Sequence, residues 1–354
     1  MAVLYIVSTE PYSGKTGICL SLGLELKQRG YKVGYMKPIG TVPGRIDSRT
    51  VDLDAYHVLQ RLDTGDHIED VSPISLTRQF IHAHLRGEQQ DSMHVIQAAF
   101  DRISKDKDVV LLENGADVNE GRFIGASAYQ IAHTLHSKTL LVAKFRSELV
   151  IDDILEAKDL LGEDFLGVVF NQVPRSERAV MEMMVPYLTR HGINVYGALP
   201  QDRTLMAVTV GEIAQHLNGT VLTATNMTDE LVENIMVGAM GQEKALRFFQ
   251  RTSNKAVITG GDRSDVQLAA LETPTKALIL TGSLQPSPIV MARAEELGVP
   301  MVLVDLDTLQ AVEKTDELVG RVRIHQKEKV DRFHTLVRNG INLERLFADA
   351  GIAK

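Results

Sequence analysis

The feature that most constrains the fold is an alternation of short apolar segments with longer amphipathic ones through the first two-thirds of the chain. The apolar residues within each short segment are continuous, which is typical of strands covered on both faces. Strands separated by helices favour a parallel sheet with right-handed crossovers. We therefore expect an α/β fold with helices on both faces of a sheet that contains six strands: Val3–Val7, Lys32–Met36, Asp108–Leu112, Lys138–Ala143, Phe165–Phe170 and Ile193–Leu199.

A second, smaller α/β set follows the sixth strand, and a chain of 354 residues suits two domains. Its predicted strands are Lys255–Ile258, Ala277–Thr281 and Met301–Val304, and a helix is predicted over Val210–Leu217. The tail, Gln326–Ala350, has the pattern of a charged helix. We place the boundary at the end of the sixth strand, which gives a first domain over 1–203 and a second over 204–354 that includes the helical tail.

Composition excludes several classes of function. Lys plus Arg is 38 and Asp plus Glu is 46, so the net charge is −8. Nucleic acids are bound by clustered Lys and Arg, so an acidic chain without a basic run is not expected to bind them. No segment approaches the 18 or so apolar residues of a membrane helix. The single cysteine, Cys19, excludes an intrachain disulfide and a cysteine-based metal site. A cytoplasmic protein is the simplest expectation.

The segment between the first strand and the first helix has the pattern of a phosphate-binding loop. It reads Ser8-Thr9-Glu10-Pro11-Tyr12-Ser13-Gly14-Lys15-Thr16. Backbone N–H groups of such a loop and the following helix N-terminus bind phosphate. Ser13, Gly14, Lys15 and Thr16 are therefore predicted to bind a nucleotide, with Lys15 at the β/γ phosphates and the Thr16 hydroxyl on Mg²⁺. An ordinary strand–turn–helix with an exposed lysine is the alternative.

Several polar residues follow other predicted strands and could complete a nucleotide site. Glu113 ends the third strand, where a carboxylate can hold Mg²⁺ directly or through water. Asp54 is our second metal candidate, whereas its neighbour Asp52 suits a helix N-cap at least as well. Lys37 ends the second strand and is the catalytic candidate, because strand ends of a parallel sheet border the ligand crevice. Asn171 ends the fifth strand and is predicted to bind a purine base; each of these residues could also be an ordinary surface or turn residue.

These motifs resemble the dethiobiotin-synthetase-type P-loop fold, whose loop is one residue longer than the ordinary one, so that its first glycine aligns with Ser8. The resemblance covers about the first 200 residues and continues through Asp54, Glu113-Asn114-Gly115 and Val169-Phe170-Asn171-Gln172-Val173. It implies a P-loop NTPase-like domain that binds ATP and Mg²⁺. Two departures, Asn114 to Val118 after the central strand and Tyr12 in place of an acidic residue, fall in the substrate half of that site. Biotin synthesis is therefore not expected.

The closer resemblance is to the N-terminal region of long bacterial phosphate acetyltransferases. Tyr129 to Leu135 is similar to that subgroup, and the second half resembles a DRTGG domain in Thr209 to Ile213, Val237 to Met240, Ile258 to Asp265 and Leu280 to Gly282. Ser264 stands where the family name has threonine. Such enzymes place this pair ahead of a catalytic acetyltransferase domain. Only a helical tail follows here, so we expect that domain to be missing and expect no acetyltransferase activity.

Three functional hypotheses follow. The first is a nucleotide-binding regulator or sensor, with ATP and Mg²⁺ in the first domain and an effector of the second domain left open. The second is an ATP-dependent ligase or kinase for a small carboxylate, in which Lys37 and the loop from Thr41 to Asp54 bind substrate. Acetyl transfer is third. Because Ser8 and Thr9 replace the usual glycine, we expect modest affinity and little hydrolysis. A small DRTGG-like domain favours a homodimer, and the segment Ile235–Met240 is either part of its interface or core of its own domain.

Overall fold

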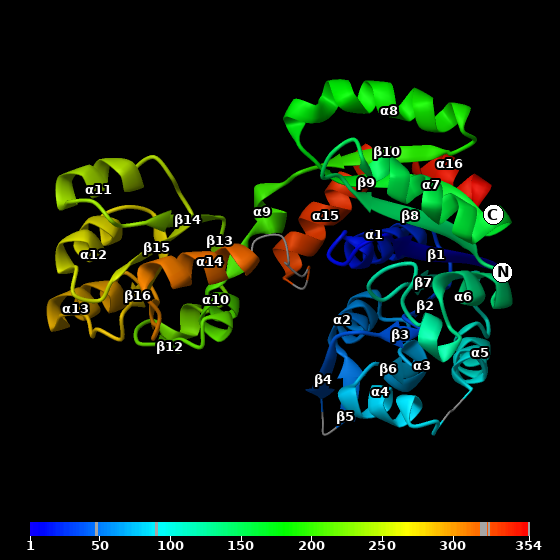
Figure 1. Cartoon of the computed structure of the whole chain (residues 1–354), viewed down its shortest axis with the longest axis horizontal. Helices are drawn as coiled ribbons and strands as arrows, with labels where there is room; N and C mark the ends of the chain where they lie inside the picture. Colours follow the sequence, from blue (N-terminus) through cyan, green and yellow to red (C-terminus); the bar gives the residue numbers. More distant parts are fainter. Residues whose placement is uncertain (47–48, 89–90, 319–323, 325, 353–354) are drawn as a thin grey trace. The chain divides into compact units, whose positions relative to one another are not determined.

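The computed structural model describes the chain except for residues 47–48, 89–90, 319–323, 325 and 353–354. The chain forms two compact units, shown in Figure 1. Residues 1–201 and 323–354 make the first unit, and residues 202–322 make the second. This division differs from the predicted domains, 1–203 and 204–354, mainly at the C-terminal end of the chain.

The first unit is built on a six-stranded parallel sheet, which confirms the predicted α/β class. Its strands lie in the order β10-β9-β8-β1-β7-β2, so the N-terminal strand β1 is an inner strand, with three strands on one side of it and two on the other. β1 pairs in parallel with both β7 and β8. All six strands overlap the predicted ones: β1 (Ala2–Ser8), β2 (Val33–Met36), β7 (Val109–Glu113), β8 (Lys138–Lys144), β9 (Phe165–Val173) and β10 (Val195–Pro200).

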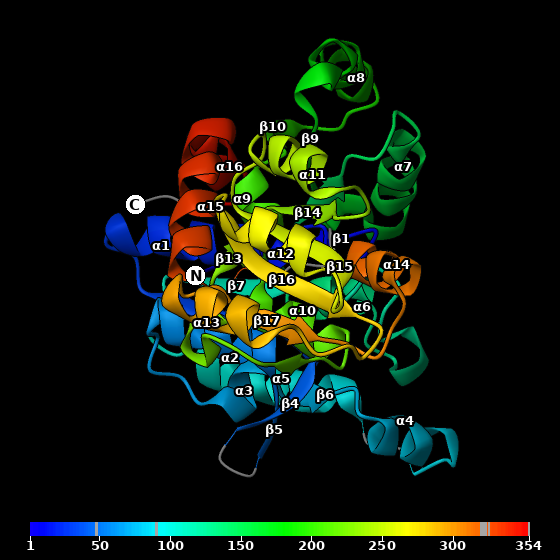
Figure 2. The same cartoon turned by 90° about the vertical axis from the view of Figure 1, so that its left-hand side faces the viewer.

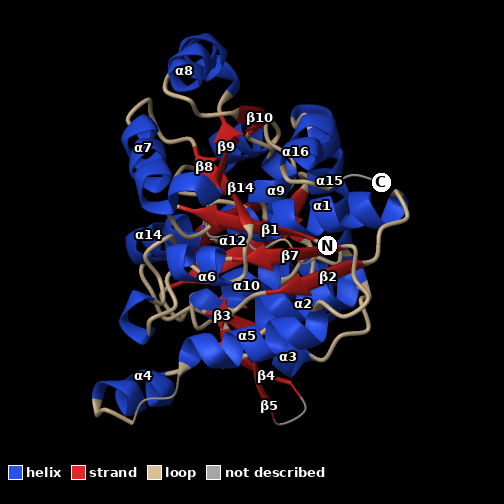
Figure 3. Cartoon of the chain, turned by 90° about the vertical axis from the view of Figure 1, so that its right-hand side faces the viewer, coloured by secondary structure: helices blue, strands red, loops and turns tan. Residues whose placement is uncertain are grey.

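Helices cover both faces of this sheet, as Figure 3 shows with α1 and α15 on one side and α7 on the other. Continuous apolar strands require this cover, because both faces of each strand must leave water. The helices are α1 (Lys15–Gln28), α2 (Leu53–Leu62), α3 (Ile68–Val71), α4 (Arg78–Leu85), α5 (Ser92–Ile103), α6 (Ala128–Thr134), α7 (Val150–Leu161), α8 (Arg178–Arg190), α15 (Lys327–Gly340) and α16 (Leu343–Asp349). The structure also has two short strand pairs that the sequence analysis did not predict. They are β3 (Ile39–Gly40) with β6 (Ile74–Ser75) and β4 (Pro43–Ile46) with β5 (Arg49–Asp52).

The C-terminal tail is helical, as predicted, but it packs on the first unit. Gly197 of β10 forms an antiparallel bridge with Ile341, and the Asn342 N–H donates to the Tyr196 carbonyl at 2.7 Å. A Cβ on Gly197 would lie 2.0 Å from the Gly340 carbonyl oxygen, so the close approach requires glycine there. The predicted assignment of this tail to the second domain therefore differs from the structure, because an amphipathic pattern identifies the apolar face of a helix but not the surface that it covers.

The second unit has a five-stranded sheet of its own, in the order β12-β17-β16-β15-β14. The strands are β12 (Thr220–Val221), β14 (Asn234–Val237), β15 (Lys255–Gly260), β16 (Thr275–Thr281) and β17 (Met301–Leu303), and a small pair joins β11 (Val208–Thr209) to β13 (Leu231–Val232). Its helices are α9 (Arg203–Met206), α10 (Val210–His216), α11 (Gln242–Phe249), α12 (Ser264–Leu271), α13 (Pro288–Glu296) and α14 (Thr308–Leu318). Figure 2 shows α11, α12 and α13 along one face of this sheet.

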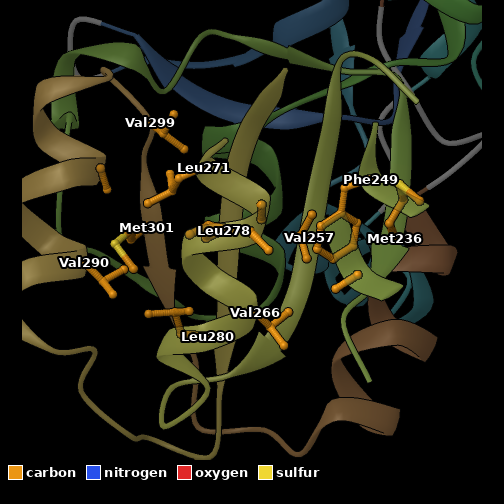
Figure 4. Packing of buried hydrophobic residues seen from close by; sticks show 14 residues of the cluster. Met236, Phe249, Val257, Val266, Leu271, Leu278, Leu280, Val290, Val299 and Met301 are labelled. Carbon is orange, nitrogen blue, oxygen red and sulfur yellow. The ribbon is translucent and has the colours of Figure 1, made fainter. Parts of the chain in front are cut away.

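The segment Ile235–Met240 contributes to the core of the second unit. Met236 lies on β14 and is buried in a cluster with Phe249 and Val257, which Figure 4 shows from close by. Met240 is partly buried and packs against the same cluster. Of the two interpretations left open by the sequence, the structure therefore favours internal packing for this segment.

Lys255 is a buried charge in the second unit. Its side chain is fully buried in β15, and the amine donates to the Pro274 carbonyl at 3.0 Å. Burial lowers its pKa to about 8, from an ordinary 10.5. Between pH 8 and 10.5, Lys255 is therefore protonated in the unfolded chain and mostly neutral in the folded chain. The free energy of unfolding therefore rises with pH in this window, by up to about 1.4 kcal/mol per pH unit.

We expect Lys255→Met to stabilise the second unit at pH 7, where the wild type must bury a protonated amine. The advantage of the variant should shrink as the pH rises from 8 to 10.5. Differential scanning calorimetry of both proteins at several pH values measures the difference in transition temperature. Subtracting the two curves cancels the titration of every other group, and a difference that is constant over this range would contradict the expectation.

Candidate phosphate-binding site

The loop between β1 and α1 is positioned at the centre of the first sheet. β1 is apolar and buried along nearly its whole length, and α1 begins at Lys15. Gly14 precedes the helix with φ +96°, a left-handed conformation that favours glycine. The first hydrogen bond of α1 runs from the Ile18 N–H to the Gly14 carbonyl at 3.0 Å. The N–H groups that precede Ile18 have no acceptor within the helix, so they are available to an anion at this helix end.

The Lys15 amine is folded back over the loop. It donates to the Ser8 hydroxyl at 2.6 Å, to the Ala116 carbonyl at 2.7 Å and to the Glu10 carbonyl at 3.4 Å. The side chain is almost fully buried. Burial lowers the pKa of Lys15 to about 8, against the opposing negative charge of Glu113. A cation held only by neutral oxygens in a buried position favours an anionic partner.

Thr16 lies beside Glu113, which ends β7 as predicted. The Thr16 hydroxyl donates to Glu113 Oε1 at 2.5 Å, and the Tyr35 hydroxyl donates to Glu113 Oε2 at 2.8 Å. Glu113 is 1% exposed. Burial raises its pKa, while the Lys37 charge and the hydrogen bonds from the two hydroxyl groups oppose this rise. The structure therefore brings together two of the three predicted metal ligands.

The third predicted metal ligand, Asp54, lies beside the catalytic candidate Lys37. The Lys37 amine is 3.0 Å from Asp52 Oδ1 and 3.6 Å from Asp54 Oδ2. Asp52 also accepts from the Val42 N–H and, as the predicted N-cap of α2, from the Ala55 N–H, both at 2.8 Å. Burial lowers the pKa of Lys37, but the negative charges of Glu113, Asp52 and Asp54 outweigh it and raise that pKa above its ordinary value. The Lys37 amine is thus a neutralised, buried cation.

Asn171 reaches the loop from β9. Its side-chain Nδ2 donates to the Ser13 carbonyl at 2.8 Å, and its Oδ1 accepts from the Gln172 N–H at 2.9 Å. The Ser13 hydroxyl is buried, and no hydrogen-bond partner for it occurs among the described residues. Asn171 therefore supports the backbone of the loop in this structure, and recognition of a base by Asn171 stays a prediction.

Sequence reasoning missed several members of the site. Tyr35 reaches Glu113 from the neighbouring strand β2, and the carbonyl of Ala116 reaches Lys15 from the loop after β7. Glu120 accepts from the Ala116 N–H and so holds that loop. The pairing of Tyr35 with Glu113 depends on strand order and register, and no local motif indicates either one.

Comparison with known proteins shows to which protein family the chain belongs. A family model described as an AAA domain matches residues 2–209, and one described as a DRTGG domain matches residues 212–318. The chain belongs to this AAA-domain family, as a P-loop protein of the dethiobiotin-synthetase-like type, and carries a DRTGG domain after it. The predicted family is thereby confirmed.

The curated relatives of the chain belong to one kind of enzyme. It is homologous to the N-terminal half of phosphate acetyltransferases. The Pseudomonas aeruginosa enzyme is 24% identical over 98% of this chain and 52% of its own length, and the Nitratidesulfovibrio vulgaris enzyme is 26% identical over 97% and 51%. The chain thus spans about half the length of the curated relatives it matches.

Among the solved structures that resemble part of the chain is one with a TM-score of 0.30. It comprises the CBS and DRTGG domains of the regulatory region of Clostridium perfringens pyrophosphatase, complexed with the activator diadenosine tetraphosphate. It is 15% identical and covers 41% of this chain and 71% of that one.

Within the part of the chain that the structure describes, no helix is long and apolar enough to cross a membrane.

Proposed function

We propose that the chain is a cytoplasmic regulatory protein that binds a nucleoside triphosphate, ATP in the first instance, at the loop from Ser8 to Thr16. One observation carries the proposal. The buried Lys15 amine is held by a hydroxyl and two carbonyl oxygens at the N-terminus of α1, with no carboxylate among these partners. A phosphate oxygen can take the place of these neutral acceptors and adds the charge that a buried ammonium group favours.

Magnesium suits the oxygen donors beside this loop. Thr16 Oγ1 and Glu113 Oε1 already lie 2.5 Å apart, so a cation that replaces the hydrogen-bonding proton would find a hydroxyl and a carboxylate. Mg²⁺ is usually held by one or two carboxylates together with phosphate oxygens and water. Such a site does not require a cluster of three or more His, Cys, Asp or Glu side chains. No such cluster occurs among the described residues. Thr16 and Glu113 would hold the ion, with Asp54 as a further candidate, and the ion would neutralise phosphate charge.

A regulatory role is favoured over a ligase or kinase role by the surroundings of Lys37. A lysine that binds a small carboxylate must offer an uncompensated charge, whereas the Lys37 amine already contacts Asp52 and Asp54. The loop also has Ser8 where the family has its first glycine, and the Ser8 hydroxyl is committed to the loop carbonyls and Lys15. We infer that the site holds a nucleotide and turns it over slowly.

Isothermal titration calorimetry of the full chain with ATP and with GTP, each with and without Mg²⁺, tests the proposal. We expect saturable binding of ATP that Mg²⁺ strengthens, and phosphate release that is slow on the time scale of the titration. Absence of heat for both nucleotides at millimolar concentration would refute it.

We also propose that the chain forms a homodimer through its second unit. Ile289 and Leu309 of that unit are 75% and 67% exposed, and a twofold contact would remove such apolar side chains from water. Light scattering on the full chain at micromolar concentration is expected to give a dimer. The paired substitution Ile289→Asp with Leu309→Asp should weaken it. The matched control is Leu149→Asp with Met183→Asp on the first unit, where the exposed fractions are 74% and 67%. A monomeric wild type would refute the proposal.

A further inference from the structure

Helix α15 covers one side of the phosphate loop. Its buried face consists of Lys329, Val330, Phe333 and Val337. A Cβ on Gly17 would lie 3.0 Å from the ring of Phe333, and a Cβ on Gly14 would lie 3.6 Å from the Cζ of the same ring. Phe333 is 3% exposed, and Gly17 is buried as well. The aromatic ring therefore rests on the backbone of the loop and of the first turn of α1.

The covered side is the one opposite the metal candidates. Lys15 and Thr16 reach partners in and after β7, which is the neighbour of β1 on one side. Asn171 approaches Gly14 from β9, which lies on the other side of β1, and α15 packs along β10 beyond it. A triphosphate with its terminal phosphates at Lys15 and Thr16 must therefore direct its nucleoside toward the side of Asn171 and Phe333.

The remainder of α15 and α16 is held to the first unit away from the loop. Glu25 of α1 lies 3.4 Å from the Arg338 guanidinium and 3.6 Å from the His334 ring. Arg29, at the end of α1, lies 2.8 Å from Glu344 of α16 and stacks over the Phe347 ring at 5.0 Å. α1 and α15 thus run side by side in the same direction. The first turns of α15 lie at the loop, while the later turns have anchors of their own.

We propose that α15 is an autoinhibitory element in which the Phe333 ring occupies the nucleoside end of the phosphate-loop site. The inference rests on the proposed nucleotide binding and specifies its regulation. A nucleotide binds after the first turns of α15, from Lys327 to Phe333, have moved away, while α16 stays in place. The apparent association constant for nucleotide is then the intrinsic constant multiplied by the fraction of molecules in which Phe333 has left the site.

Two ligands separate the two ends of the site. Inorganic tripolyphosphate carries the phosphates without a nucleoside, and ATP carries both, each with Mg²⁺. We expect Phe333→Ala to tighten ATP binding by about tenfold, since the competing state is removed. Tripolyphosphate affinity should change less than about twofold, because this ligand has no nucleoside that must enter the space of the ring. Val337→Ala, one turn further along the same buried face, is the matched control and should leave both affinities unchanged.

The outcomes are distinct. If tripolyphosphate binds and Phe333→Ala leaves ATP affinity unchanged or weakens it, the inference is wrong, because the ring is then mere packing or a wall that supports the base. If neither ligand binds to either protein, the proposed nucleotide site itself fails and the inference falls with it. Tighter ATP binding by both Phe333→Ala and Val337→Ala would also overturn the role given to Phe333.

Hydrogen exchange of the wild type provides a test that does not depend on the folding of a variant. Addition of ATP and Mg²⁺ should speed amide exchange over residues 327–333 and leave residues 343–349 unchanged. Slower or unchanged exchange over 327–333 at saturating ATP would contradict displacement of the helix. Tripolyphosphate is the control ligand and should leave the exchange of both segments unaffected.

Discussion

Lys15→Ala is expected to weaken binding of Mg-ATP by about 10- to 100-fold, which corresponds to about 1.4–2.8 kcal/mol. The loss has this size because hydrogen bonds to charged groups contribute about 1.5–3 kcal/mol each. The Lys15 amine is the buried cation of the loop, and its present acceptors are oxygens that a phosphate group can replace. Isothermal titration calorimetry on the full chain measures the change.

Two variants control for effects on the helix. Lys27→Ala lies on the same helix α1, and its amine donates to the Leu62 carbonyl far from the loop, so ATP affinity should be unchanged. Lys15→Met retains an apolar stem of similar length without the charge and should lose as much affinity as Lys15→Ala. ATP affinity of wild-type strength in Lys15→Ala would show that the loop is an ordinary strand–turn–helix connection.

Asp52→Ala is expected to lower the free energy of unfolding of the first unit by about 3–5 kcal/mol, because it leaves the Lys37 ammonium buried without its main partner. The side chains of Lys37 and Asp52 are 1% and 0% exposed, and the amine nitrogen of Lys37 lies 3.0 Å from Asp52 Oδ1. The same substitution removes the acceptor of the Val42 and Ala55 N–H groups. Native-state hydrogen exchange of β1 and β7 reports the change, and β15 and β16 of the second unit serve as the internal reference.

Further variants separate the charge from the hydrogen bonds. Asp52→Asn keeps an oxygen at the N-cap but leaves the cation with only the more distant Asp54 carboxylate, so most of the loss should remain. Adding Lys37→Met to Asp52→Asn removes the buried charge and should restore part of the stability. Asp54→Ala, whose carboxylate is 3.6 Å away and 15% exposed, should cost less than about 1 kcal/mol. An effect of Asp54→Ala as large as that of Asp52→Ala would contradict this assignment of the main partner.

Much of the first sheet could be predicted from the sequence because its strands are apolar on both faces and separated by amphipathic helices. The loop and Glu113 could be predicted for a related reason, since both directly follow such strands. Asp52 as an N-cap is a local feature as well, fixed by its position immediately before α2. Local patterns therefore predict the position of the loop, of the carboxylate at the end of β7 and of the helix cap.

The remaining features depend on long-range placement. Tyr35 reaches Glu113 only because β2 and β7 are neighbours in register, and Lys37 meets Asp52 only because the chain after β3 folds back. β14 is short and carries no strong alternation, so Met236 could not be assigned to a core before the sheet was known. Phe333 is separated from Gly17 by most of the chain, and no residue pattern in either segment indicates their contact.

The chain leaves the first unit at Gln201 and is part of it again in α15. The DRTGG-bearing unit is therefore an insertion within the P-loop unit, tethered at both of its ends. During synthesis, residues 202–322 leave the ribosome as one contiguous segment and can fold as soon as they emerge, since domains generally fold as units. The P-loop unit, whose sequence begins first, is completed last. Until α15 and α16 arrive, the nascent chain leaves open the side of α1 that carries Gly17, together with the β10 edge at Gly197.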